Sequence, residues 1–268
     1  MQRSSGILMP VFSLPSPYGI GTLGQAARTF VDFLKAAGQT WWQILPVGPT
    51  GYGDSPYQSF SAYAGNPYLI DLDLLREDGL LTQAEIDSAF WGADPARVDY
   101  GALYQNRLAV LSIACHRGWE RDAEAVAQFS AENRNWLPDY ALFMALKQHF
   151  GGKPWMRWPE DIRLRRREAV ERYRKALSED VALFTYLQFL FFRQWDALRA
   201  YAAEQGVRII GDLPIYVAMD SADVWAEPEN FQLDAQLTPT EVAGVPPDYF
   251  AADGQLWGNP LYNWDAMK

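Results

Sequence analysis

The hydrophobic pattern of the first fifty residues changes period twice. A short apolar run over residues 7–12 predicts a strand. From Thr22, apolar residues recur every three or four positions, which predicts a helix with Thr22 and Gln25 at capping-box spacing and Gly38 at its end. An aromatic and β-branched run from Thr40 predicts a second strand. Strand, helix and strand in this order predict a βαβ unit with parallel strands and a right-handed crossover.

The next stretch has no periodicity until residue 68. Glycine and proline recur through residues 48–67 and predict a long loop whose shape is fixed by its turns. The apolar segment Tyr68–Leu72 then favours a further buried strand.

The middle of the chain has helical spacing and few strand signals. A Gly-Gly-Lys-Pro-Trp break at residue 151 ends this series, and the basic run over residues 163–175 reads as a solvated helix face. A helix that is apolar nearly all round follows, and a strand begins at Val207. The predicted helices cover residues 81–90, 99–119, 122–129, 139–150 and 178–204.

These elements predict an α/β protein with an inserted helical subdomain, because about a hundred residues separate two strands of one sheet. The expected organisation is residues 1–72 for the first strands and the long loop, 73–177 for the helical subdomain, and 178–268 for a helix, a strand and further loops.

Composition excludes several classes of protein. The net charge is −10, which disfavours nucleic acid and anionic membrane surfaces as partners, and no apolar stretch approaches about eighteen residues. The single cysteine, Cys115, fits a reducing compartment and predicts a cytoplasmic location. His116 and His149 are too isolated to predict a metal site or a Ser-His-Asp triad.

The long loop carries the first candidate chemistry. Aromatic rings, hydroxyls, amides and a carboxylate crowd together in it, and such a set suits a sugar, whose C–H face stacks while its hydroxyls form hydrogen bonds. Asp212 follows a predicted parallel strand at its carboxyl end, where α/β proteins place their sites. A loop that only covers the core, and a helix cap at Asp212, are the alternatives.

A second pattern competes with the sugar hypothesis. Gly19, Gly21 and Gly24 satisfy the dinucleotide pattern G-x-G-x-x-G. Prolines separate these glycines from the first strand, however, and the second strand ends without an acidic residue that would hold a ribose. A nucleotide-dependent enzyme is therefore the weaker reading.

Four segments together resemble the amylomaltase family, the 4-α-glucanotransferases also called disproportionating enzymes. They are the twenty-residue run Gly-Tyr-Gly-Asp-Ser-Pro-Tyr-Gln-Ser-Phe-Ser-Ala-Tyr-Ala-Gly-Asn-Pro-Tyr-Leu-Ile, then Gly-Asp-Leu-Pro-Ile-Tyr-Val, Val-Ala-Gly-Val-Pro-Pro-Asp-Tyr-Phe and Gly-Gln-Leu-Trp-Gly-Asn-Pro-Leu-Tyr. The resemblance implies a (β/α)8 barrel with inserted subdomains and transfer of α-1,4-glucan segments between maltooligosaccharides by a retaining double displacement. It implies no cofactor, and it leaves the oligomeric state open. The substrate-binding residues that it implies are Tyr52, Ser55, Tyr57, Asp212, Asp248, Trp257 and Asn259.

One part of the family pattern is missing. The family nucleophile lies in an Arg-Ile-Asp-His-Phe-Arg-type strand, and no Arg-x-Asp-His segment occurs here. No residue is therefore assigned as catalytic, and the chain is expected to correspond to the amino-terminal half of an amylomaltase, with an incomplete barrel. We expect it to be inactive alone and prone to aggregation. A non-catalytic glucan-binding module is the alternative.

Overall fold

The computed structural model describes residues 3–51 and 53–268, which form two compact units. The first unit contains the described residues up to Val47 together with Gly65–Arg134 and Thr185–Leu213. The second contains Gly48–Ala64, Asn135–Phe184 and Pro214–Lys268. Residues 48–64 of the predicted long loop therefore belong to the second unit, whereas the chain before them and residues 65–67 belong to the first.

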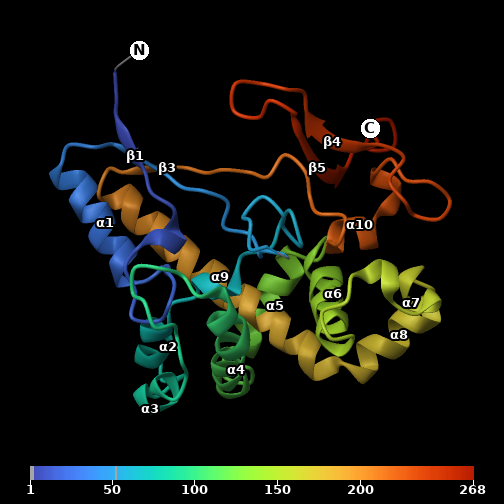
Figure 1. Cartoon of the computed structure of the whole chain (residues 1–268). Helices are drawn as coiled ribbons and strands as arrows, with labels where there is room; N and C mark the ends of the chain where they lie inside the picture. Colours follow the sequence, from blue (N-terminus) through green and yellow to red (C-terminus); the bar gives the residue numbers. More distant parts are fainter. Residues whose placement is uncertain (1–2, 52) are drawn as a thin grey trace. The chain divides into compact units, whose positions relative to one another are not determined.

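The first unit is built on a parallel three-stranded sheet in the order β1-β2-β3, whose outer strands β1 and β3 are labelled in Figure 1. The strands are β1 (Gly6–Leu8), β2 (Trp41–Gln43) and β3 (Arg208–Ile210). Leu8 pairs with Gln43, which pairs with Ile210, so these three side chains lie on one face. The parallel pairing of β1 with β2 confirms the predicted βαβ unit.

The opposite face of the sheet packs on helix α1 (Gln25–Ala36). Trp42 is fully buried there, and its ring meets Phe30 edge to face with centroids 5.2 Å apart. Val31 and Leu34 are also fully buried, one helical turn apart, as the predicted periodicity requires. Gly38 has a φ of +69° just after the helix, which confirms the predicted stop.

The predicted capping box of this helix is wrong. Gly24 is the N-cap, and it forms no side-chain cap hydrogen bond. The Thr22 hydroxyl instead donates to the Asp71 carboxylate at 2.5 Å. The Thr22 side chain does not cap the helix, because the buried Asp71 carboxylate needs a hydrogen-bond donor.

The strand predicted over Tyr68–Leu72 is also wrong. Asn66 accepts a hydrogen bond from the Tyr68 backbone and Pro67 follows it, so a 3₁₀ turn, η2 (Pro67–Leu69), forms there. The Asp71 side chain then caps helix α2 (Leu72–Glu77) by accepting from the Leu74 backbone. Two capping side chains outweigh the β propensity of the apolar residues between them.

The helix predicted over residues 81–90 is shorter in the structure, at residues 83–87, whereas the other helices predicted in the first unit lie close to their expected bounds. Asp99 caps α4 by accepting from the Ala102 backbone, and the predicted helix 99–119 is confirmed to within a residue at each end. In α9, Leu187 and Leu190 are fully buried, as expected for a helix that is apolar nearly all round. The bounds are η1 (Val11–Ser13), α3 (Gln83–Asp87), α4 (Tyr100–Gly118), α5 (Ala123–Glu132) and α9 (Ser178–Glu204), of which the last begins in the second unit.

An aromatic cluster forms the core of the second unit. The rings of Phe143, Trp158 and Trp225 contact one another in a triangle with centroid distances of 5.4, 6.0 and 5.7 Å, and the Phe143 ring also meets Phe60. The Trp225 indole N–H donates to the Ile162 carbonyl at 3.1 Å, so the largest side chain of this core has its polar atom satisfied. The elements of this unit are α6 (Leu137–His149), η3 (Trp155–Arg157), α7 (Glu160–Arg163), α8 (Arg167–Ala176), α10 (Ala222–Ala226), η4 (Pro228–Asn230), β4 (Val242–Val245) and β5 (Gln255–Pro260).

The predicted solvated helix face is confirmed in α8. Arg167 pairs with Glu171 along the helix, and Arg172 pairs with Asp161 of α7. These cations are neutralised by neighbouring carboxylates at the surface, so the run does not form a concentrated positive patch.

Candidate functional site

The long loop is held in one shape by its own backbone. The Gly51 backbone donates to the Gln58 carbonyl at 2.9 Å, and the Phe60 backbone donates to the Pro49 carbonyl at 3.2 Å. The buried Ser59 hydroxyl bonds the Pro49 and Ser61 carbonyls and so closes the base of the loop. A rigid loop presents its tip side chains at low entropic cost, which a binding loop needs.

The tip of this loop carries two of the predicted site residues. Tyr57 is 45% exposed, so one part of its ring is open to solvent. Ser55 is half-buried, and its hydroxyl accepts from the Tyr57 backbone at 3.3 Å. Burial raises the pKa of the neighbouring Asp54 carboxyl above its usual range. Tyr52, which the sequence also singled out, lies outside the described residues.

An antiparallel hairpin of β4 and β5 carries three more. Asp248 lies in the turn, where its carboxylate accepts the backbone N–H groups of Phe250 and Ala251, each at 2.8 Å. Trp257 is 40% exposed, and its indole N–H donates to the Gln255 side chain at 3.0 Å. The sequence reading treated this region as irregular and missed both strands. The register shift between Val242 and Gly244 breaks the simple alternation that would have indicated them.

Asn259 ties the hairpin to the loop. Its side-chain oxygen accepts from the Gln58 amide at 3.0 Å, and its amide donates to the Val217 carbonyl at 2.8 Å. Asn259 is only 4% exposed. Its observed contacts are therefore with protein groups, and they join three segments of the second unit around the loop that bears Tyr57.

Asp212 belongs to the first unit. It follows β3 at its carboxyl end, one residue beyond Gly211, and it is half-buried. Its place on the strand agrees with the sequence reading. The structure thus brings Ser55, Tyr57 and Asn259 together through Gln58, with Asp248 and Trp257 on the same hairpin as Asn259.

Sequence reasoning missed a buried ion pair beside this loop. The Lys147 ammonium is 2.5 Å from Asp220 and also donates to the Gly152 carbonyl at 3.0 Å. The same ammonium lies 4.9 Å from the centre of the Phe60 ring. The sequence feature that could have predicted this pair is the position of Lys147 on the apolar side of a helix, because a buried lysine needs a partner of opposite charge.

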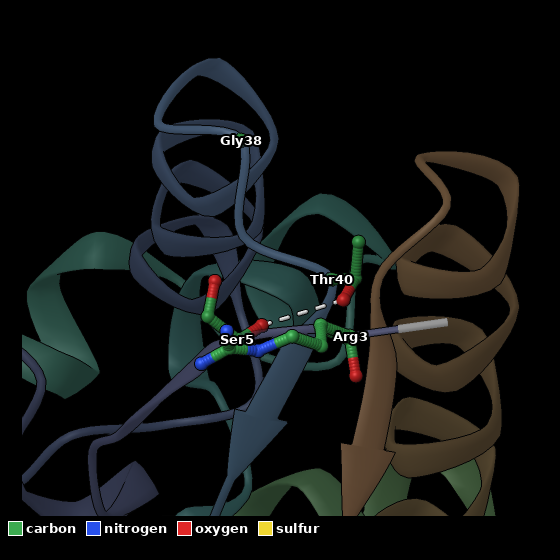
Figure 2. Close-up of a pocket in the computed structure, with 5 residues that line it drawn as sticks. Arg3, Ser5, Gly38 and Thr40 are labelled. Carbon is green, nitrogen blue, oxygen red and sulfur yellow. Dashed lines mark hydrogen bonds between the residues drawn. The ribbon is translucent and has the colours of Figure 1, made fainter. Parts of the chain in front are cut away.

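A surface hollow in the first unit lies at the amino-terminal edge of the sheet and has a volume of about 310 Å³. Figure 2 shows Arg3, Ser5, Gly38 and Thr40 around it, with the Thr40 hydroxyl donating to the Ser5 carbonyl at 3.3 Å. These residues precede β1 and β2, whereas Asp212 follows β3. The hollow is therefore at the sheet edge opposite the one that the sequence singled out.

The three glycines of the dinucleotide pattern serve packing. A Cβ on Gly21 would overlap the Val11 carbonyl, and one on Gly24 would overlap the Asp71 carboxylate. Gly19 has a φ of +80° and approaches the Trp91 carbonyl just as closely. Close packing against protein groups, one of them the Asp71 carboxylate, thus explains these glycines without a bound nucleotide.

Residues 3–51 and 53–268 contain neither a metal-binding cluster nor a membrane-spanning helix. No cluster of three or more His, Cys, Asp or Glu side chains there could hold a metal ion. Within the same residues, no helix is both long and apolar enough to span a bilayer.

Comparison with known proteins gives one consistent result. The glycoside hydrolase 77 family model, described as 4-alpha-glucanotransferase, matches residues 9–268. The 4-alpha-glucanotransferases of Thermus thermophilus and Clostridium butyricum are 54% and 49% identical to the chain, covering 100% and 97% of it but only 53% and 54% of themselves.

Solved structures agree with the sequence relatives. The amylomaltase from Streptococcus agalactiae in complex with acarbose superposes with a TM-score of 0.96 at 46% identity, over 99% of this chain and 54% of that one. The amylomaltase from Corynebacterium glutamicum shares the fold, with a TM-score of 0.74 at 21% identity. The chain thus spans about half the length of the relatives it matches, and it belongs to the 4-alpha-glucanotransferase family.

Proposed function

We propose that this chain supplies part of the glucan-binding surface of a 4-α-glucanotransferase. The whole protein would transfer α-1,4-glucan segments between maltooligosaccharides by a retaining double displacement. The observation that carries this proposal is the joint between the Tyr57 loop and the Trp257 hairpin through Gln58 and Asn259. This joint fixes the exposed rings of Tyr57 and Trp257 within the second unit. The relatives of the chain are named 4-alpha-glucanotransferases.

We propose seven substrate-binding residues, of which Asp212 belongs to the first unit. Tyr57 and Trp257 would stack on sugar rings, Ser55 and the two aspartates would bond hydroxyls, and Asn259 would contribute mainly by holding Gln58. The proposed set is Tyr52, Ser55, Tyr57, Asp212, Asp248, Trp257 and Asn259.

The architecture that we propose is a (β/α)8 barrel to which β1, β2 and β3 contribute neighbouring strands. The parallel order and the carboxyl-end position of Asp212 support it. Residues 73–177 would be the inserted helical subdomain, between residues 1–72 and 178–268. A cytoplasmic location is part of the same proposal.

The catalytic carboxylates would lie in the half of the relatives that this chain does not cover. In a retaining transfer, one carboxylate attacks the anomeric carbon, and a second protonates the leaving oxygen and then deprotonates the acceptor hydroxyl. No segment of this chain has the Arg-x-Asp-His pattern of the nucleophile strand. We therefore propose that the 268 residues bind glucan without transferring it.

The first test is incubation of the purified chain with maltotriose. We expect neither glucose nor longer maltooligosaccharides from the chain alone, and both from a chain fused to the complementary half of the Thermus thermophilus relative. Transfer by the 268 residues alone would overturn the assignment and would make Asp212 the first suspect for the nucleophile.

The second test is calorimetric titration with maltoheptaose. Replacing Trp257 with alanine removes an exposed stacking ring and should weaken binding about fivefold, because an aromatic contact contributes about 1 kcal/mol. Trp264→Ala is the matched control, since Trp264 is exposed on the same unit outside the proposed surface. Equal losses in both variants would contradict the proposed surface. Glucan binding by the chain, together with no transfer by the fused chain, would favour a non-catalytic glucan-binding module.

A further inference from the structure

Residues 59–62, the return arm of the loop that bears Tyr57, are joined by three hydrogen bonds to helix α10 and the segment just before it. The Ala218 backbone donates to the Ser59 carbonyl at 3.3 Å, and the Ala222 backbone donates to the Phe60 carbonyl at 2.8 Å. The third bond runs the other way, from the Ala62 backbone N–H to the Asp223 carboxylate, with its two oxygens at 3.2 and 3.4 Å. Asp223 is the only ionisable group among the three contacts.

Asp223 is also tied to the inner side of the loop. The buried Ser61 hydroxyl forms a hydrogen bond with its carboxylate and accepts the backbone N–H groups of Tyr63 and Ala64. Residues 61–64 are thereby wrapped around one carboxylate. A charged acceptor makes such bonds about twice as strong as a neutral one does.

The ionisable groups facing Asp223 are mostly acidic or neutral. Glu227 is the C-cap of α10, one turn beyond Asp223, and the Tyr262 hydroxyl interacts electrostatically with Asp223 and with the hydroxyls of Tyr216 and Tyr63. Lys147 of the adjoining α6 is engaged by Asp220 at 2.5 Å. Burial of the carboxylate is the main cause that raises its pKa to about 6, and Glu227 adds to the rise.

We propose that Asp223 is a positioning residue that holds the Tyr57 loop in its binding shape, and that its protonation releases the arm at residues 59–62. The inference rests on the proposed function, because the loop matters only if Tyr57 and its neighbours bind glucan. Above the titration, the carboxylate accepts the Ala62 N–H as an anion. Below it, a neutral acid makes the weaker bond, so the arm detaches more often while the carboxyl itself stays buried on α10.

Amide hydrogen exchange of peptides spanning residues 57–64 tests the anchor without any sugar. Exchange is expressed as a protection factor, which removes the intrinsic pH dependence of the chemistry. We expect protection of the Ala62 amide to fall about fivefold to tenfold from pH 7.5 to pH 5 in the wild-type chain. Asp223→Asn should show intermediate protection with no step, because its amide oxygen still accepts but cannot ionise.

The control variant is Glu227→Gln. It removes a charge that raises the pKa of Asp223 and leaves the anchor in place, so the step should persist with its midpoint at lower pH. Asp223→Ala should lose protection at both pH values. An unchanged step in Asp223→Asn, or unchanged protection in Asp223→Ala, would overturn the proposal.

A maltoheptaose titration at pH 7.5 and pH 5 then separates this proposal from the proposed function. Wild-type affinity should fall over this range, whereas Asp223→Asn should bind with an intermediate affinity that does not change. If exchange follows the prediction and no glucan binds at either pH, the anchor stands and the proposed function fails. If glucan binds with the same pH dependence in both chains, the proposed function stands and Asp223 does not position the loop.

Discussion

Arg107 is completely buried in the first unit and is held mainly by backbone carbonyls. Its guanidinium donates to the Tyr18 carbonyl at 3.2 Å and to the Ile70 carbonyl at 2.5 Å, and it lies over the Trp91 ring. Burial lowers its pKa to about 10, and the charge of Asp71 opposes that shift. The side chain therefore remains protonated at neutral pH while it satisfies two carbonyls that precede and follow α1.

Replacing Arg107 with alanine should be strongly destabilising. The variant leaves a cavity and two buried carbonyls without donors, so the free energy of unfolding should fall by about 3 kcal/mol or more. Urea unfolding followed by circular dichroism measures this loss. Arg97→Ala is the control, because the ion pair of Arg97 with Asp94 is exposed and should contribute less than about 0.5 kcal/mol. Equal losses at the two positions would show that Arg107 is not the structural link described here.

Asp223 has opposite effects on local order and on global stability. Its folded-state pKa of about 6 lies above the ordinary value of 3.8, so between these values the folded chain binds more protons than the unfolded chain. The group's stabilising contribution is complete below pH 3.8 and is lost as the pH rises through 6. The ionised carboxylate that anchors the Tyr57 loop thus lowers the stability of the whole fold, as functional sites often do.

Asp223→Asn should remove this pH dependence. Relative to the variant, the wild-type chain should lose about 2 kcal/mol of unfolding free energy between pH 4 and pH 7. The reason is that a difference of one unit between the folded and unfolded pKa values corresponds to about 1.4 kcal/mol. Urea titrations at several pH values measure the difference between the two curves. Parallel curves would mean that Asp223 titrates in the folded state as it does when unfolded.

At the scale of the element, Gly118 sets how closely helices α4 and α9 pack. A Cβ at Gly118 would overlap the Tyr186 hydroxyl, which itself donates to Asp122 at 2.6 Å. Gly118→Ala should therefore push the ring away and destabilise the fold by about 2 kcal/mol, despite the better helix propensity of alanine.

Gly101→Ala provides the matched control on the same helix. The nearest atom to its added Cβ would be the Asp99 carboxylate oxygen that caps the helix, at 3.3 Å, which has to move by only a few tenths of an ångström. Alanine there should be neutral or slightly stabilising, because it lowers the entropy of the unfolded chain. Thermal melts of both variants measure the contrast. A Gly118→Ala variant as stable as Gly101→Ala would show that the two helices can separate freely.

Periodicity predicted the long elements well, and local chemistry explains the failures. Helix 178–204 has the bounds expected from its apolar run, and α4 begins after its Asp99 cap. The strand predicted over Tyr68–Leu72 failed because the caps Asn66 and Asp71 formed a turn and a helix instead.

The sequence predicted only part of the candidate site. Tyr57 and Trp257 stood out as aromatic residues in loops, and both have exposed rings. Asn259 was expected on substrate but bonds Gln58 and Val217. Asp223 passed unnoticed, because the burial and the Ala62 contact that distinguish it from other surface aspartates depend on tertiary packing.

At the scale of the whole molecule, one face of the first unit's sheet is open to solvent. Leu8 is 52% exposed and Ile210 is 42% exposed, and they lie in register on either side of Gln43. Within the described residues, β1 and β3 each have a partner strand on one side only. Exposed apolar side chains and unpaired strand edges favour association, so this face accounts physically for the expected aggregation.

Covering this face should convert the chain from an associating species into an active one. We expect the chain alone to bind a hydrophobic dye and to sediment as oligomers, and its mixture with the complementary half of the Thermus thermophilus relative to lose dye binding and gain disproportionation of maltotriose. Leu8→Lys should raise the solubility of the chain alone and abolish this complementation, because a buried lysine in the joined sheet would be unpaired. Phe33→Lys is the control, since Phe33 is equally exposed but lies on α1, which packs on the other face of the sheet. It should improve solubility without affecting complementation. Loss of complementation in both variants would mean that the complementary half contacts α1 as well as the open face of the sheet.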